Sequence, residues 1–284
     1  MNKLSFVASM LMMCLPMTMM AQKNGAKAQN KPDPNFQIYL CFGQSNMEGN
    51  ANIEDIDRTG VNPRFMAMYA VDDEKAGWKK GQWHTAVPPQ ARPTTGLTPV
   101  DYFGRKMVDN LPDSIKVGTI TVAVGGASID LFDKRTCKAY LKKQPDWMKN
   151  FASQYNGNPY ARLIELAKIA QKQGVIKGIL LHQGETNNGD VNWPNRVKTV
   201  YHDILKELHL KAEDVPLLVG ETVRQDQGGI CWKHIAIVDD IAKTIPTAYV
   251  ISSKGCPQRG DGLHFIAESY RTMGKRYANM MLSL

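Results

Sequence analysis

The sequence predicts an α/β fold, a three-layer α/β/α sandwich built around a parallel sheet of five or six strands. Apolar runs rich in β-branched residues alternate along the chain with segments whose apolar residues recur at helical spacing. The apolar runs show little in–out alternation, which indicates strands buried on both faces and therefore helices on both sides of a parallel sheet. The predicted strands span residues 36–42, 64–71, 116–124, 176–182, 215–221 and 247–252.

The segments between these strands predict the helices. Within residues 98–110, Val100, Phe103 and Met107 fall on one helical stripe, and an aspartate follows early in the first turn. The same kind of periodicity predicts helices over residues 160–173, 195–209, 231–244 and 266–282.

Two long connections, 72–97 and 127–159, interrupt this alternation. Loops of this length in a compact domain are usually functional or disordered. Their aromatic content favours the walls of a sugar-binding cleft. The side chains concerned are Trp78, Trp83 and His84 in the first connection, and Trp147 and Tyr155 in the second.

The amino-terminal segment does not belong to this domain. Lys3 supplies a positive charge, residues 4–20 are almost wholly apolar or small, and Ala21-Gln22 is a cleavage point, so residues 1–21 are typical of a secretory signal peptide. The run is too short for a comfortable membrane span, the other interpretation. The polar residues 22–34 predict a disordered leader. We therefore expect a folded domain over residues 35–284, exported to the periplasm or the cell exterior and with no membrane span.

Cysteine usage and charge exclude some classes of protein. Export permits disulfides, and Cys231 with Cys256 is the candidate pair, whereas Cys41 in the first strand is expected to be a buried free thiol. The pairing of Cys137 stays open. The chain has no C-x-x-C pair and no His/Cys cluster, which predicts no metal site. The formal charge of +8 comes from scattered lysines, so we expect a solvated surface and no nucleic-acid partner.

Three predicted strands end in glycine-bearing segments: Gly43-Gln44-Ser45, Gly125-Gly126-Ala127 and Gln183-Gly184-Glu185. Active sites of open parallel sheets gather at the carboxyl ends of the strands. We therefore expect these three segments to meet at one edge of the sheet.

Ser45 and the distant Asp261-Gly262-Leu263-His264 have the composition of a serine hydrolase site. A serine hydroxyl is a weak nucleophile until a base removes its proton, and the base is held by a third group. An aspartate three residues before His264 can accept a hydrogen bond from Nδ1 and leave Nε2 free as the base. The other interpretations are a serine that only caps a helix and an aspartate that caps the last helix.

Ester hydrolysis also needs donors for the developing oxyanion. Three candidates lie at the strand ends: the Ser45 N–H, the Gly126 N–H and the Gln183 side-chain amide. Glu185 is unfavourably placed for this chemistry, because a carboxylate beside the oxyanion site opposes the developing negative charge. It is the alternative orienter of His264, an anchor for an arginine such as Arg224, or a support of the loop, as is Gln44. Asp261 ranks ahead of Glu185 as orienter.

The blocks Phe42-Gly43-Gln44-Ser45-Asn46-Met47, Gly125-Gly126-Ala127-Ser128-Ile129, His182-Gln183-Gly184-Glu185 and Asp261-Gly262-Leu263-His264 resemble the SGNH-hydrolase superfamily. Within it they are similar to the branch of sialate O-acetylesterases and the acetylxylan esterases of carbohydrate esterase family six. The resemblance implies a flavodoxin-like fold, no cofactor, Ser45 as nucleophile, His264 as base and Asp261 as orienter. A glutamate matching Glu185 partners the histidine in some members, so that assignment stays open. Ala127 departs from the Thr or Ser common in the family.

Together these features predict an exported serine esterase that removes O-acetyl groups from a glycan through an acetyl-serine intermediate. Two alternatives stay open. One is an esterase acting on lipids, thioesters or other non-carbohydrate esters, and the other is a glycan-binding protein that has lost catalysis.

Overall fold

The computed structural model describes residues 31–284 and contains the predicted sheet. Its strands are β1 (Phe36–Gly43), β2 (Phe65–Met68), β3 (Trp83–Thr85), β4 (Lys116–Ala123), β5 (Val175–His182), β6 (Leu217–Gly220) and β7 (Ala248–Ile251). They form one sheet in the order β3-β2-β4-β1-β5-β6-β7, in which only β3 is antiparallel to its neighbour. If β3 at the edge and its neighbour β2 are left out, the remaining order β4-β1-β5-β6-β7 is that of flavodoxin-like folds.

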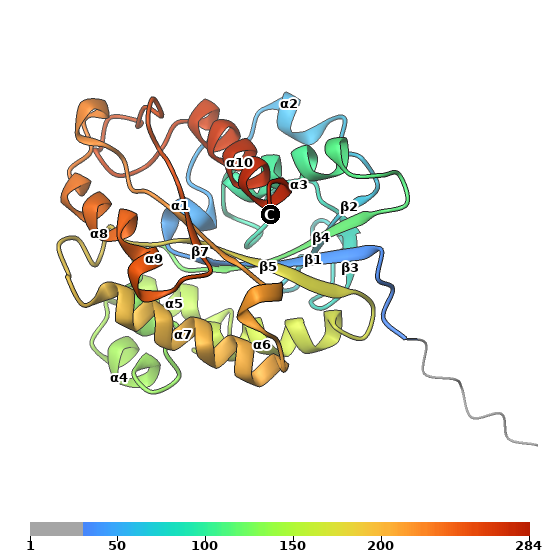
Figure 1. Cartoon of the computed structure of the whole chain (residues 1–284), viewed down its shortest axis with the longest axis horizontal. Coiled ribbons are helices and arrows are strands. Elements are labelled where there is room, and N and C mark those ends of the chain that lie inside the picture. The colour runs from blue at the N-terminus through green and yellow to red at the C-terminus, as the bar shows by residue number, and fades with distance from the viewer. Residues whose placement is uncertain (1–30) are drawn as a thin grey trace, which may run out of the picture. The chain divides into compact units, whose positions relative to one another are not determined.

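Helices cover both faces of this sheet (Figure 1). On one side α3 and α10 pack together, and on the other α6 and α7 do so. The helices are α1 (Ser45–Glu48), α2 (Asp55–Arg58), α3 (Pro99–Asn110), α4 (Cys137–Lys142), α5 (Asp146–Ser153), α6 (Pro159–Ala170), α7 (Trp193–Leu208), α8 (Ile235–Asp239), α9 (Ile241–Thr244) and α10 (Ala267–Leu282).

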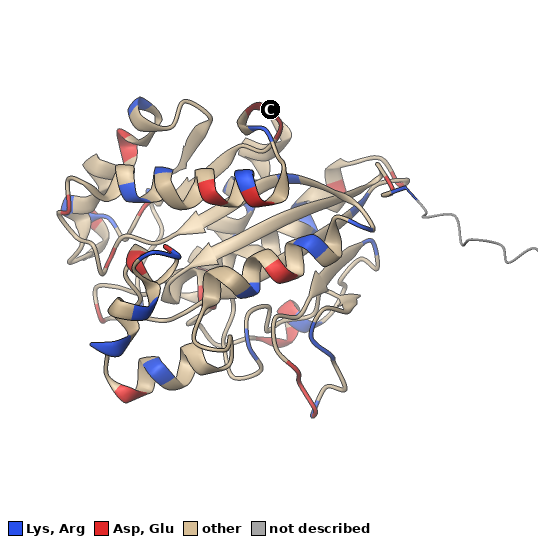
Figure 2. Cartoon of the chain, turned by 90° about the horizontal axis from the view of Figure 1, so that it is seen from below, with Lys and Arg blue, Asp and Glu red and all other residues tan. Residues whose placement is uncertain are grey.

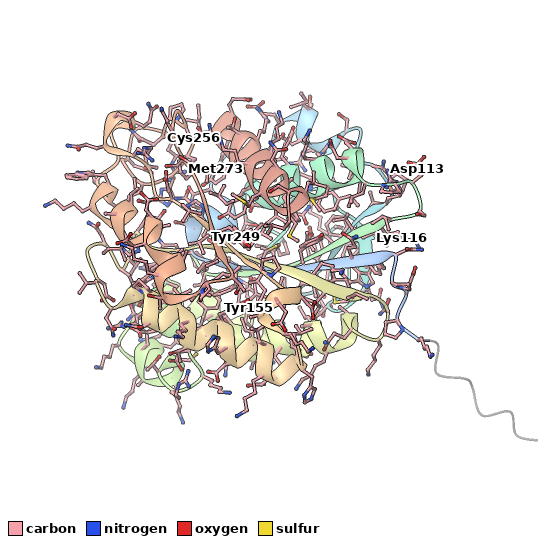
Figure 3. The ribbon with its side chains drawn as sticks, in the orientation of Figure 1. Asp113, Lys116, Tyr155, Tyr249, Cys256 and Met273 are labelled. Carbon is pink, nitrogen blue, oxygen red and sulfur yellow. The ribbon has the colours of Figure 1, made fainter. Side chains whose placement is uncertain are left out.

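The sheet separates two apolar layers, as expected for strands buried on both faces. Alternate residues of β1 point to opposite sides: Leu40 joins the layer under α6 and α7, and Cys41 the layer under α3 and α10. In Figure 3, Tyr155 lies on the side of the sheet that α6 and α7 cover, and Met273 lies on the side that α3 and α10 cover. The three-layer α/β/α sandwich is therefore confirmed.

Local sequence explains where the long helices begin. Thr98 and Asp101 form a capping box before α3, in which each side chain bonds the backbone N–H at the other position, and a proline occupies the first helical turn. Asn158 caps α6 in a similar way by accepting from the Ala161 N–H at 2.9 Å.

The structure differs from the expectation in the connections. All six predicted strands are present, and residues 72–97 contribute a seventh, β3, which pairs with β2 over only three residues. Residues 127–159 contain α4 and α5, and the helix expected over 231–244 is divided into the short α8 and α9. Three residues are too few for a periodic signal, which explains why β3 was not predicted.

The candidate disulfide between Cys231 and Cys256 is not formed. Cys41, Cys137, Cys231 and Cys256 are all free and buried. Cys231 and Cys256 face different partners, since the Cys231 thiol lies 3.6 Å from the Glu185 carbonyl oxygen and the Cys256 sulfur lies 3.4 Å from the Arg276 guanidinium. Burial raises the pKa of the Cys231 thiol to about 11.

The predicted signal peptide, residues 1–21, and most of the leader, residues 22–34, lie outside the described residues. The described end of the leader contacts the domain, because the Asp33 N–H donates to the Gln173 carbonyl at 3.0 Å. Among residues 31–284, no helix combines the length and apolar character that a membrane crossing requires. Lys and Arg are interspersed with Asp and Glu on the face seen in Figure 2.

Candidate active site

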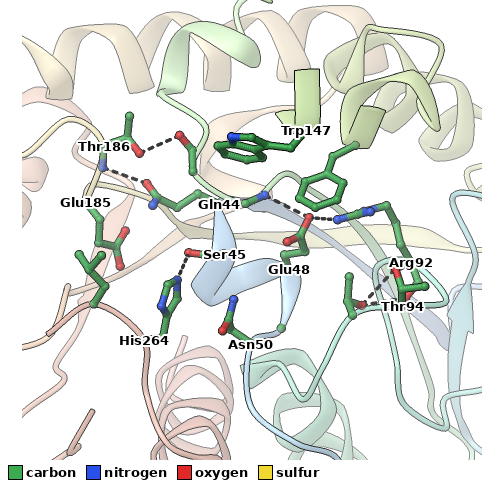
Figure 4. Close-up of a pocket in the computed structure, with 16 residues that line it drawn as sticks. Gln44, Ser45, Glu48, Asn50, Arg92, Thr94, Trp147, Glu185, Thr186 and His264 are labelled. Carbon is green, nitrogen blue, oxygen red and sulfur yellow. Dashed lines mark hydrogen bonds and ion pairs between the residues drawn. The ribbon is translucent and has the colours of Figure 1, made fainter. Parts of the chain in front are cut away.

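The turn after β1 brings Ser45 to the carboxyl edge of the sheet. Gly43 ends the strand with φ +154°, and a Cβ on it would lie 2.1 Å from the His182 carbonyl oxygen, so only glycine fits between β1 and β5. Helix α1 then begins at Ser45 itself. The serine is 6% exposed and lines a pocket (Figure 4).

The structure brings Ser45, His264 and Asp261 together. His264 Nε2 lies 2.9 Å from Ser45 Oγ, across 219 positions of sequence, and His264 Nδ1 lies 2.7 Å from Asp261 Oδ2. Because the carboxylate accepts at Nδ1, the ring presents Nε2 to the serine hydroxyl. This is the geometry of a nucleophile, a base and an orienting carboxylate.

Several donors hold Asp261 in place. Its Oδ1 accepts the Leu263 and His264 N–H groups at 2.9 Å each, and its Oδ2 also accepts from Arg259 Nε at 2.8 Å. Burial alone would raise the pKa of this carboxyl, but the hydrogen bonds from His264, Arg259 and Leu263 outweigh it and hold the pKa well below its usual range. Asp261 is therefore ionised at neutral pH. It organises the turn before α10 and orients His264 at the same time.

The buried Asn46 side chain joins the segments that meet here. Its Nδ2 donates to Glu185 Oε1 and, at 2.9 Å, to the Leu263 carbonyl, while its Oδ1 accepts from the Tyr270 hydroxyl at 2.7 Å. The turn after β1, the loop after β5 and the loop of His264 are thus fixed relative to one another.

Ser45 and Gly126, whose N–H groups the sequence predicts as oxyanion donors, both line the pocket. Within residues 31–284, the N–H groups of Ser45 and Gly126 make no hydrogen bond. Gly126 has φ +69°, and a Cβ there would lie 2.8 Å from the Trp147 ring, so a side chain would strain both the backbone and the pocket wall. The Thr186 hydroxyl donates to the Gly126 carbonyl at 2.9 Å and fixes the loop.

Gln183 cannot serve as the third donor. Its side chain is completely buried, Nε2 donates to Asn187 Oδ1 at 2.7 Å and to Gln44 Oε1 at 3.1 Å, and Oε1 accepts from the Trp193 indole. It does not line the pocket. The prediction failed because these tertiary partners turn the amide into the protein interior.

Gln44 lines the pocket instead. Its Oε1 accepts from Gln183 Nε2 and from the Gly184 and Thr186 N–H groups, the last two at 3.3 Å each. Within the described part of the chain its Nε2 group has no hydrogen-bond partner. The network therefore directs the oxygen of Gln44 to the protein and its NH₂ group to the pocket.

Glu185 lies in the pocket wall but does not contact His264. Its Oε1 accepts from Asn46, and its Oε2 is buried with no partner among residues 31–284. Burial raises the pKa of Glu185 to about 7. Of the two candidate orienters, only Asp261 contacts the imidazole, and Arg224 pairs with Glu221 at 2.8 Å rather than with Glu185.

A buried ion pair that was not among the predicted site residues holds the segment of Gly125. Glu48 Oε1 accepts from Arg92 and, at 3.1 Å, from the Gly125 N–H. Burial raises the pKa of Glu48 despite the neighbouring Arg92. The Arg92 guanidinium lies 4.3 Å from the centre of the Phe151 ring, and both residues line the pocket. The sequence signal for Glu48 as a pocket residue is its position three residues after Ser45, because residues three apart lie on the same face of a helix.

The pocket has a volume of about 490 Å³, within the range of small-molecule sites. Trp147, 48% exposed, forms one wall next to Gly126. Polar residues line the side of the pocket opposite Trp147. Asn50 and Thr94 lie on this side in Figure 4. Tyr155, the other residue expected in the cleft wall from this connection, is buried and donates to the Ala123 carbonyl at 3.3 Å.

The three aromatic residues Trp78, Trp83 and His84 of the first long connection do not line this pocket, although other residues of that connection do. Trp83 pairs with Met68 at the edge of the sheet, and its ring centre lies 4.8 Å from that of Phe36 at the start of β1. Trp78 and His84 stack on each other with ring centres 5.1 Å apart. The expectation that these three aromatics line the cleft is thus not met, because they pack among themselves and against the sheet edge.

No group of three or more potential metal ligands occurs within residues 31–284.

Comparison with known proteins is consistent with this geometry. The model of the family "carbohydrate esterase, sialic acid-specific acetylesterase" matches residues 35–283. A probable carbohydrate esterase of Arabidopsis thaliana is 23% identical over 277 residues, which cover 89% of this chain and 92% of the plant protein.

Solved structures support the fold. The structure of that Arabidopsis thaliana protein has a TM-score of 0.65 at 19% identity and covers 88% of this chain and 99% of its own. NanS has a TM-score of 0.63 at 15% identity, with 89% and 98% covered. XAC1771, a carbohydrate acetylesterase from Xanthomonas citri, has a TM-score of 0.56 at 20% identity, with 85% of this chain and 55% of its own covered.

Proposed function

The chain belongs to the carbohydrate esterase family of sialic acid-specific acetylesterases and is a carboxylic ester hydrolase, and we propose that it removes O-acetyl groups from glycans through an acetyl-serine intermediate on Ser45. The observation that carries the proposal is the contact of His264 Nε2 with Ser45 Oγ, at 2.9 Å, with Asp261 behind the imidazole.

In the first half of the reaction Ser45 Oγ attacks the acetyl carbonyl carbon and His264 Nε2 takes its proton. Asp261 stays ionised, because its hydrogen bonds lower its pKa, and its charge stabilises the imidazolium. When the tetrahedral intermediate collapses, the bond to the sugar oxygen breaks and His264 returns the proton to that oxygen.

The carbonyl oxygen becomes negative in the tetrahedral intermediate. The Ser45 and Gly126 N–H groups donate to it, and the Gln44 NH₂ group takes the role expected of Gln183. Glu185 opposes this charge less than an ordinary glutamate would, because burial raises its pKa to about 7 and so leaves part of the carboxyl neutral near neutral pH.

In the second half, water attacks the acetyl-serine while His264 Nε2 accepts its proton. The Ser45 oxygen leaves, takes the proton back from His264, and acetate is released. The same three side chains thus serve both halves of the cycle.

Replacement of the nucleophile tests the proposal. Ser45→Ala is expected to lower kcat for an aryl acetate by at least about 10⁴-fold, since loss of a serine nucleophile removes the covalent route. Acetate release from a panel of acetylated polysaccharides then identifies the sugar. Undiminished turnover by the variant would refute the proposal.

A lipid or other long-chain ester is the competing substrate. The polar side of the pocket disfavours it, because an acyl chain there would leave Asn50 and Thr94 without hydrogen-bond partners. We expect kcat/KM for aryl esters to fall from acetyl to octanoyl. A preference for octanoyl would favour the lipid reading.

We also propose that the protein is exported, on the strength of the apolar run in residues 4–20. Mass analysis of the protein from the cell envelope and the medium should find a chain that begins at Gln22. An uncleaved chain in the cytosol would contradict this.

A further inference from the structure

A second hollow continues the catalytic pocket along the protein surface. Its volume is about 530 Å³, and it shares four lining residues with the catalytic pocket: Gly49, Asn50, Thr94 and Thr95. Beyond them it runs over residues 51–53 to Arg58 and Gly96. We call this hollow the outer groove. Because these four residues line both hollows, a ligand bound beside Ser45 can extend directly into the outer groove.

The outer groove presents polar groups that have no role in the fold. Within residues 31–284, the side-chain amides of Asn50 and Asn52 and the hydroxyl of Thr94 make no hydrogen bond to protein. Asn52 and Thr94 are exposed and Asn50 is half-buried. Amides and hydroxyls both donate and accept, which suits the hydroxyl groups of a sugar chain. At the far end, the Arg58 guanidinium adds further donors. One of its N–H groups donates to the Pro88 carbonyl at the long distance of 3.5 Å.

The backbone beneath these groups is held in place. The Gly96 N–H donates to the Gly49 carbonyl at 2.9 Å, and the Leu97 N–H donates to the Ala51 carbonyl at 2.8 Å. Arg259, which also binds Asp261, donates to the Asn50 carbonyl at 3.0 Å. The groove is therefore tied to the loop of the catalytic aspartate. A preformed site loses less entropy when it binds a chain.

We propose that the outer groove is a subsite for further sugar units of the substrate, so that the enzyme acts on acetylated oligosaccharides or polysaccharides rather than on single sugars. This inference rests on the proposed function and extends it. The acetylated unit lies in the pocket between Ser45 and Trp147, and the neighbouring units extend past Asn50 and Thr94 toward Asn52 and Arg58.

Chain length tests the subsite. We would measure kcat/KM on chemically acetylated oligosaccharides of glucose, xylose and mannose, each from one to four units, with an aryl acetate as reference. In the best series, kcat/KM is expected to rise at least about tenfold between one and three units. Equal values for one and three units in every series, or turnover of the aryl acetate alone, would overturn the proposal.

Substitution in the outer groove tests where the added units bind. The readout is the ratio of kcat/KM for the trimer to kcat/KM for the monomer. Asn52→Trp fills the groove, so this ratio should fall toward one. Asn52→Ala removes only the side-chain amide, so the ratio should fall by a few-fold. Lys172→Trp, at an exposed site after α6 that lines neither hollow, is the matched control and should keep the wild-type ratio. A wild-type ratio in both Asn52 variants would refute the assignment.

Binding without turnover separates this inference from the catalytic proposal. Titration calorimetry of Ser45→Ala with the same oligosaccharides should give a Kd that falls with chain length, and Asn52→Trp added to that variant should abolish the trend. If Ser45→Ala still hydrolyses the aryl acetate, the catalytic proposal fails. If it is inactive but shows no dependence of Kd on length, only the subsite fails.

Discussion

Two loops place a carboxylate near Ser45, and their surroundings give these carboxylates opposite properties. Asp261, on the loop before α10, is partly exposed and receives hydrogen bonds from two backbone N–H groups, Arg259 and His264. Glu185, on the loop after β5, is buried, and among residues 31–284 its one side-chain donor is Asn46. The pKa of Asp261 is lowered, and that of Glu185 is raised to about 7. The pKa of each carboxyl is therefore set by its burial and by the number of its hydrogen-bond donors, rather than by residue type.

The largest effect expected from this comparison is that of Asp261→Asn. The amide cannot stabilise the imidazolium and can favour the wrong tautomer of His264, so kcat for an aryl acetate should fall by about 10²–10⁴-fold. KM should change much less, because Asp261 does not line the pocket. An unchanged kcat would transfer the orienting role to another group.

Gly126→Ala is expected to have an intermediate effect. The new Cβ would lie 2.8 Å from Trp147 on a backbone with φ +69°, so the Gly126 N–H should move away from the oxyanion and kcat/KM should fall by about 10²-fold. Gly189→Ala is the matched control, since Gly189 has φ +80° but nothing within 4 Å of an added Cβ. Equal losses in both variants would mean that backbone strain alone is responsible.

Glu185→Gln is expected to have the smallest effect on turnover, a change in kcat of less than about tenfold. Glutamine can still accept from Asn46, and no contact with His264 is lost. If kcat instead collapses while Asp261→Asn remains active, the roles of the two carboxylates are reversed.

The same variant has a distinct effect on stability. The folded-state pKa of Glu185, about 7, lies above the ordinary value of 4.5, so the unfolded chain releases this proton first and stability falls as pH rises between those values. Glu185→Gln removes this penalty. Its free energy of unfolding should exceed that of the wild type by up to about 3 kcal/mol at pH 8 and match it at pH 4. Denaturant unfolding at both pH values measures the difference, and a variant that is less stable at pH 8 would contradict the account.

The strands and the meeting of Ser45, His264 and Asp261 could be predicted because local patterns determine them. β1, β4 and β5 appear as long apolar runs, and parallel strands bring their carboxyl ends to one edge, so Ser45, Gly126 and the Gln183–Glu185 segment had to be neighbours. The spacing of Asp261 and His264 within one turn indicated their contact.

Side-chain direction could not be predicted in the same way. Gln44 and Gln183 both lie at strand ends, and the partners Trp193 and Asn187 decide that Gln183 points inward and Gln44 toward the pocket. The aromatic residues posed the same problem, because Trp147 and Trp83 both lie in the long connections but only Trp147 lies beside Gly126.

The nucleophilic role of Ser45 is tested most directly by trapping the acyl enzyme. Wild-type protein mixed with an excess of aryl acetate and quenched in acid within one turnover should gain the mass of one acetyl group, and peptide mapping should locate it on Ser45. An acetyl group on another residue, or full steady-state turnover by Ser45→Ala, would contradict the account.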